Sequence, residues 1–131
     1  MGNRAVITFA PFKATGVGIY VHWNGGRASV EGFLLACKRL EFRSPGVDQS
    51  YAMARLTQAI TAYFTGGLSV GVGLVKDLDG DNGDNGTYVI GGDWEIVARR
   101  HHSGSEEIDP AKTEAIATAI TLALADVKTD A

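Results

Sequence analysis

The sequence predicts an α+β fold in which a single antiparallel β-sheet packs against two antiparallel helices and a C-terminal helix. Three observations support this fold class. Short β-branched runs alternate with glycine-rich turns, apolar residues recur at helical spacing between them, and an Asp-Pro pair opens a final amphipathic stretch. The 131 residues are enough for one domain, so we expect residues 1–131 to share a single core.

Two strands are predicted near the N-terminus. Residues 5–9 are β-branched and aromatic, and Pro11 and Gly16 separate them from a second strand over residues 17–23. The short connection indicates a hairpin.

Two helices are predicted next. After Gly25-Gly26, an apolar stripe spaced at i, i+3, i+4 and i+7 predicts a helix that ends between residues 39 and 43: Val30, Phe33, Leu34 and Cys37. A second helix is expected to start at Asp48 or Ser50 and to stop at Gly66-Gly67. Its apolar stripe is Met53, Leu56, Ile60, Tyr63 and Phe64. Arg55 lies off this stripe, so it faces solvent, a ligand or another subunit.

The C-terminal half predicts three more strands and a helix. Residues 68–74 alternate between apolar and small side chains. The apolar set, which is expected to face the core, is Leu68, Val70, Val72 and Leu74. The other face carries only Ser69, Gly71 and Gly73, so we expect another part of the structure to pack closely against it. Strands are also expected over residues 87–90 and 94–99. Asp109-Pro110 marks a helix start, and its apolar face is Ile116, Ile120, Leu124 and Val127.

Net charge and composition exclude several classes of binding partner. The net charge of −3 and a sequence pI near 5.5 give no general attraction to nucleic-acid backbones or anionic membranes, so a phosphate site has to be a local pocket. The single cysteine, Cys37, cannot form an internal disulfide, and no leader or membrane-spanning run is apparent. We therefore expect a soluble, cytoplasmic protein with neither a membrane nor a long nucleic acid as partner.

The turn before the first helix is one candidate site. Trp23, Asn24, Gly25 and Gly26 lead into the predicted helix start, and Arg27 follows. Amides at a helix start receive anions with the help of the helix dipole, and an arginine adds a fork of donors. The same residues also suit a compact strand-to-helix connection without a ligand.

The polar loop over residues 77–86 is a second candidate. Its alternating aspartates resemble a calcium loop, but Asn82 stands where the sharp turn needs glycine, so no metal is expected. Asn82, Asp84 and Asn85 are instead candidates for reading a base edge or a ribose hydroxyl. A purely structural hairpin is the alternative.

The run Arg99-Arg100-His101-His102 is a third candidate. Strand alternation predicts that Arg99 and His101 share one face and that Arg100 and His102 share the other, so one arginine serves a pocket and the sequence leaves open which. The alternative is an edge strand protected by charge.

No catalytic constellation is visible. The chain has no nucleophile elbow, no zinc-protease motif and no acid–base pair at catalytic spacing. We therefore predict no catalytic residue, no metal and no cofactor. A small phosphodiesterase with His22 as its base is the enzymatic alternative.

Several of these motifs together resemble the first class of phage Thoeris anti-defence proteins. The resemblance covers about residues 2–100. The runs that carry it are Gly2-Asn3-Arg4-Ala5-Val6-Ile7, Tyr20-Val21-His22-Trp23-Asn24-Gly25-Gly26-Arg27, Ala54-Arg55-Leu56 and Asp81-Asn82-Gly83-Asp84-Asn85-Gly86.

The resemblance implies a sponge that sequesters glycocyclic ADP-ribose, uncleaved, in the cytoplasm of the bacterial host, so that the Thoeris effector is not activated. It also implies a homo-oligomer such as a hexamer, with cyclic oligonucleotides at a second site in some members. By motif, Arg55, Asn82 and Asn85 belong to the nucleotide pocket, as does Arg99 or Arg100. Residues 72–75 offer no match to the family's stacking aromatic. An inhibitor that covers a surface of a defence enzyme is the alternative binding function.

Overall fold

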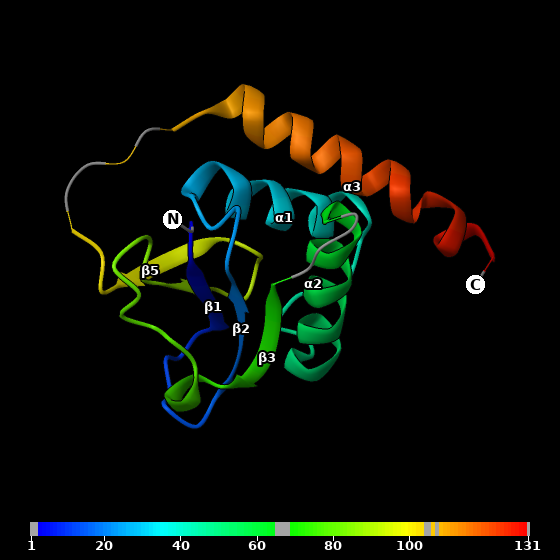
Figure 1. Cartoon of the computed structure of the whole chain (residues 1–131). Coiled ribbons are helices and arrows are strands. Elements are labelled where there is room, and N and C mark those ends of the chain that lie inside the picture. The colour runs from blue at the N-terminus through cyan, green and yellow to red at the C-terminus, as the bar shows by residue number, and fades with distance from the viewer. Residues whose placement is uncertain (1–2, 65–68, 104–105, 107, 131) are drawn as a thin grey trace.

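The computed structural model describes residues 3–64, 69–103, 106 and 108–130, with side chains described through residue 125. Within these residues, five strands form one sheet in the order β3-β2-β1-β4-β5, and three helices accompany it (Figure 1). The elements are β1 (Ala5–Phe9), β2 (Val17–Val21), α1 (Arg27–Arg39), α2 (Gln49–Tyr63), β3 (Val70–Leu74), β4 (Thr87–Ile90), β5 (Ile96–Arg100) and α3 (Pro110–Asp130), with a short 3-10 turn at Val75–Asp77. The predicted α+β class is confirmed.

The sheet is mixed, whereas the sequence predicted an antiparallel one. The β1–β2 hairpin and the β4–β5 pair are antiparallel as predicted, but β1 pairs with β4 in parallel, Ile7 opposite Tyr88. A parallel pair needs a long connection, and here that connection contains β2, α1, α2 and β3. Local patterns identify each strand but not the direction in which distant strands meet.

One face of the sheet and the helices share a buried apolar core. Ile7, Ile19 and Tyr88 of the strands belong to the same cluster as Phe33 of α1 and Leu56 of α2. Helix α3 crosses α1 on its outer side (Figure 1), where a Cβ at Gly32 would stand 2.8 Å from Ile116. Glycine at this position therefore lets the two helices approach closely.

Most predicted element ends are confirmed. Asp48 caps α2 by accepting a hydrogen bond from the Tyr51 amide at 3.0 Å, and Asp109 accepts one from the Lys112 amide at 3.1 Å at the start of α3. Strand β5 begins two residues later than predicted because Trp94 has a left-handed backbone, with φ 65°. The predicted stop at Gly66-Gly67, Leu68 and the side chain of Val127 lie outside the described residues.

The prediction that Val72 and Leu74 point into the core is wrong. They are 56% and 37% exposed, respectively, because β3 is the edge strand and Val72 borders an open cleft that Met53 and Thr57 of α2 also line. The bare face of β3 is covered in part: the Leu78 side chain would lie 3.6 Å from a Cβ at Gly73, but no atom of the described ranges lies within 4 Å of one at Gly71.

An ion pair between α1 and α3 predicts a specific acid response. Arg39 donates to both carboxylate oxygens of Glu114, at 2.5 and 2.6 Å, and these hydrogen bonds lower the pKa of Glu114 to about 2. Because the folded pKa lies below the ordinary one, the contribution to stability is full above about pH 4.5 and is lost as pH falls toward 2. We expect the difference in urea midpoint between wild type and Glu114→Gln to shrink across this range. A difference that persists at pH 2 would contradict it.

None of the helices in the described ranges is both long enough and apolar enough to span a bilayer.

Candidate functional site

The turn before α1 is fixed by contacts from distant residues. The Gly25 amide donates to the Asn3 carbonyl at 2.8 Å, and the Tyr88 hydroxyl donates to the Gly25 carbonyl at 2.7 Å. A Cβ at Gly25 would stand 2.5 Å from the Asn3 carbonyl oxygen, and Asn24 has a positive φ of 59°. Gly26 is the N-cap of α1 and provides no side-chain cap. The first amides of α1 therefore keep their capacity to bind an acceptor.

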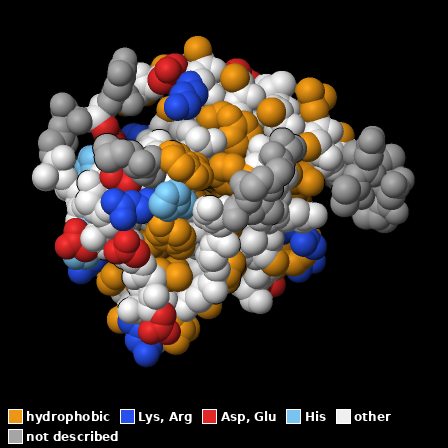
Figure 2. Space-filling model, viewed as in Figure 1, with side chains coloured by type: hydrophobic (Ala, Val, Ile, Leu, Met, Phe, Trp, Pro, Cys, Tyr) orange, Lys and Arg blue, Asp and Glu red, His pale blue; other side chains and the backbone are white. Residues whose placement is uncertain are grey.

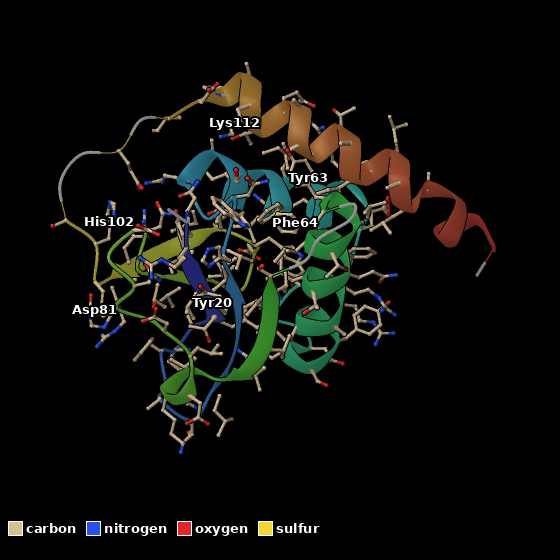
Figure 3. The ribbon with its side chains drawn as sticks, viewed as in Figure 1. Tyr20, Tyr63, Phe64, Asp81, His102 and Lys112 are labelled. Carbon is tan, nitrogen blue, oxygen red and sulfur yellow. The ribbon has the colours of Figure 1, made fainter. Side chains whose placement is uncertain are left out.

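A cavity of about 370 Å³ opens at this helix start. This volume is within the roughly 300–1,000 Å³ range of small-molecule sites. Its lining combines the α1 start with residues from three other segments: Gly26, Arg27, Ala28, Asn85, His102, Glu106, Asp109 and Lys112. His102 lies in the chain that leads from β5 toward α3, and Lys112 lies in the first turn of α3 (Figure 3).

Two arginines converge on one carboxylate in the wall of this cavity. Arg27 Nη1 donates to Glu106 Oε2 at 3.2 Å, and Arg99 Nη1 pairs with the same oxygen. The His102 ring nitrogen Nε2 lies 3.5 Å from the other Glu106 oxygen. The Glu106 carboxylate therefore occupies the position where these basic groups meet.

The protonation states follow from these contacts. Burial raises the pKa of the Glu106 carboxyl, but hydrogen bonds and charge from Arg99 and Arg27 outweigh it, so the net pKa lies below the ordinary value. A hydrogen bond to Glu31 is the main cause of the raised pKa of Arg27; burial opposes it, and Glu106 adds to it. Glu106 is thus an anion held by cations.

Two buried nitrogens at the same place lack a hydrogen bond within the described residues. They are Arg99 Nε and His102 Nε2, the latter near Glu106 but without hydrogen-bond geometry. Buried nitrogen donors are satisfied in most folded proteins, so the unsatisfied Arg99 Nε–H indicates capacity for a further acceptor, and His102 Nε2 adds a second donor in the tautomer that carries its proton there.

The structure decides which arginine of β5 contacts residues that line the cavity. The Arg99 guanidinium lies 3.8 Å from the Tyr88 ring centroid, and its Nη2 donates to the Asn85 carbonyl at 2.8 Å. Arg100 instead lies over Phe12, 4.0 Å from that ring centroid. Of these two arginines of β5, only Arg99 is held beside the cavity.

The predicted pairing of Arg99 with His101 on one face is wrong. Arg99 and His102 both approach Glu106, whereas His101 approaches Asp81, at 3.9 Å. The alternation fails because β5 ends at Arg100 and His101 has a left-handed φ of 57°.

The loop candidates have different environments. The Asn82 amide is 4% exposed: it donates to the Asp79 and Gly86 carbonyls and accepts from the Asp84 and Gly86 amides. Its hydrogen-bonding capacity is used inside the loop, and of the loop residues only Asn85 lines the cavity.

Asp84 forms an ion pair with Arg4. It accepts from both the backbone amide and the Nε of Arg4, at 3.0 and 2.8 Å, and these hydrogen bonds lower the pKa of Asp84. The structure therefore gives Asp84 an ion pair that joins the loop to the start of β1.

Arg55 and Trp23 do not line this cavity. Arg55 lies on α2 with its guanidinium 4.3 Å from the Tyr51 ring centroid and donates to Gln58 at 3.4 Å. Trp23 is 48% exposed and contacts the His22 ring edge-on. The structure thus brings together Gly26, Arg27, Asn85 and Arg99 from the predicted site residues.

Sequence reasoning missed five of the eight residues that line the cavity: Ala28, His102, Glu106, Asp109 and Lys112. The Asp109-Pro110 helix start places Lys112 in the first turn of α3 and was a usable signal. Glu106 follows its partners His102 and Arg99 by four and seven positions, but these residues lie partly outside β5, so no regular spacing indicates the contact, and Arg27 is 79 positions away.

The surroundings of the cavity are mixed in charge. In the space-filling view, lysine, arginine, histidine and acidic side chains gather on the left, whereas hydrophobic side chains spread over the middle and top (Figure 2). A larger cleft of about 860 Å³ lies elsewhere, between the β1–β2 connection, α2 and β3, and has Phe9, Met53 and Val72 in its lining. The described residues contain no group of three or more His, Cys, Asp or Glu side chains that could hold a metal.

Comparisons of the chain with protein-family models, with curated proteins and with solved structures gave no match.

Proposed function

We propose that this protein is a phage anti-defence sponge, which binds a cyclic nucleotide immune signal of the glycocyclic ADP-ribose class and sequesters it without cleaving it. Binding in the host cytoplasm keeps the signal from the Thoeris effector. A homo-oligomer is part of the proposal, and so is a second site for cyclic oligonucleotides.

The observation that carries the proposal is the convergence of Arg27 and Arg99 at the start of α1, beside the unsatisfied Arg99 Nε and His102 Nε2. A cyclic ADP-ribose carries two phosphate charges. Charge-assisted hydrogen bonds contribute roughly 1.5–3 kcal/mol each, so two arginines and helix-start amides can hold such an anion tightly. Nothing in this group acts as a nucleophile, which favours binding over hydrolysis.

Titration calorimetry with glycocyclic ADP-ribose tests the proposal, with ADP-ribose and AMP as matched linear ligands. We expect saturable, stoichiometric heat with the cyclic nucleotide and recovery of the intact mass after the protein is denatured. A cleaved ligand would identify the phosphodiesterase alternative instead. No heat with any nucleotide would reject the sponge and leave the protein-interaction inhibitor.

Glu106 supplies a prediction that is specific to this pocket. Its carboxylate occupies the place where Arg27 and Arg99 would receive a phosphate, so the ligand has to displace a like charge. Replacing it by a neutral isostere ends that competition. We expect Glu106→Gln to tighten the calorimetric affinity for the cyclic nucleotide roughly tenfold.

Glu114→Gln is the matched control for this prediction. It removes a carboxylate that is also paired with an arginine, but that pair joins α1 to α3 and does not line the cavity. We expect wild-type affinity from the control. Equal or weaker binding by Glu106→Gln would place the phosphate site elsewhere.

A further inference from the structure

The outer edge of β3 presents unpaired backbone groups. Hydrogen bonds join the His22 amide to the Ser69 carbonyl and the Val75 amide to the Gly16 carbonyl, and the antiparallel register between these points is regular. Residues of an antiparallel strand turn their backbone groups alternately toward and away from the neighbour. Ser69, Gly71 and Gly73 therefore face β2, and Val70, Val72 and the Leu74 amide face outward, where no described strand lies.

The two edges of the sheet differ in chemistry. Strand β5 carries Arg99 and Arg100, and charged side chains are one means by which proteins protect an open edge. Strand β3 reads Val-Gly-Val-Gly-Leu, with no charge, proline or bulge. Its exposed Val72 and Leu74 continue onto Val17 of β2, which is 45% exposed. The β3 edge is therefore open and apolar.

The described residues give no reason for a glycine at position 71. A Cβ there would meet none of their atoms within 4 Å, and the residue lacks a positive φ. Glycine inside a strand costs about 0.5–1 kcal/mol relative to alanine, and it often marks the close approach of another backbone. A missing side chain that the chain itself does not need is consistent with a partner that packs there.

From these three observations we infer that β3 pairs with β3 of a second copy of this chain, antiparallel and about a two-fold axis at Val72. In this register the two Val72 residues exchange both backbone hydrogen bonds, and each Leu74 amide reaches the partner's Val70 carbonyl. The strand is nearly palindromic about Val72, so glycine meets glycine and branched side chains meet each other, as an isologous interface requires. The lack of charge along the edge lets two chains of net charge −3 approach.

Sedimentation velocity over a range of micromolar concentrations tests this inference with the full chain and no nucleotide, so its outcome is independent of the proposed ligand. We expect wild type to exceed the 13.8 kDa of one chain. Val72→Lys places like charges directly opposite each other across the axis, and we expect it to weaken association roughly tenfold or more. Val97→Lys is the matched control: Val97 lies on β5 and is 59% exposed, against 56% for Val72.

Three outcomes would overturn the inference: a monomeric wild type, an assembly that survives Val72→Lys, or one that Val97→Lys disrupts equally. Circular dichroism and melting temperature check that both variants fold. Hydrogen exchange gives a second readout, since the amides of Val70, Val72 and Leu74 become more protected as concentration rises only if this edge pairs.

Discussion

Replacing Arg99 by methionine is expected to weaken nucleotide binding roughly a hundredfold, since the substitution removes charge-assisted hydrogen bonds worth about 1.5–3 kcal/mol each. The methionine stem still covers the Tyr88 ring, over which the guanidinium now lies at 3.8 Å. The unsatisfied Nε and the Glu106 ion pair are lost together. Titration calorimetry measures the change, and the melting temperature shows whether the fold has suffered.

Arg100→Met is the control on the next residue of the same strand. Its guanidinium lies over Phe12, away from the cavity, so we expect affinity within about twofold of wild type. If Arg100→Met weakened binding as much as Arg99→Met, the cavity at the start of α1 would not be the nucleotide site.

Among the variants proposed for this protein, Gly86→Ala is expected to lower the free energy of unfolding most, by about 3 kcal/mol or more. The residue has φ 68°, which alanine adopts only with strain, and the added Cβ would stand 2.2 Å from the Arg100 carbonyl oxygen. Backbone atoms of the neighbouring strand cannot move aside without disturbing the β4–β5 ladder. Urea unfolding measures the change in free energy of unfolding.

Gly83→Ala separates the two causes of this loss. Gly83 has a similar φ of 77° in the same loop, but its added Cβ would meet only the end of the Arg4 side chain at 3.8 Å. We therefore expect the backbone cost alone, about 1 kcal/mol. Equal losses in the two variants would show that the close contact at Gly86 relaxes freely.

Local signals predicted most of the elements correctly. Asp109 was identified as a helix start, and Asp48 as one of two candidates beside Ser50. A cap is a hydrogen bond to an amide three residues away, so both partners are visible in a short stretch of sequence. Strand Thr87–Ile90 was predicted with its observed bounds for a similar reason, since glycine turns flank an unbroken β-branched and aromatic run.

The candidate site was predictable only in part. The helix start and its arginine follow from turn chemistry, which identified Gly26 and Arg27. The choice between Arg99 and Arg100 required the Tyr88 ring and the Asn85 carbonyl, which hold the Arg99 guanidinium. Glu106 required the connection between β5 and α3 to pass the start of α1, where its partner Arg27 is 79 positions away in the sequence.

The sequence by itself determined which residues form strands, helices and tight turns, because hydrogen bonds within a few residues and the spacing of apolar side chains decide these. Only the tertiary structure decided that β1 runs parallel to β4, that Val72 lies at an open edge, and that two arginines share one carboxylate. Alternation tells which side chains share a face of a strand, but what covers that face depends on chain segments far away. Strand order and the ion pairs between distant residues therefore depend on how the whole sheet assembles.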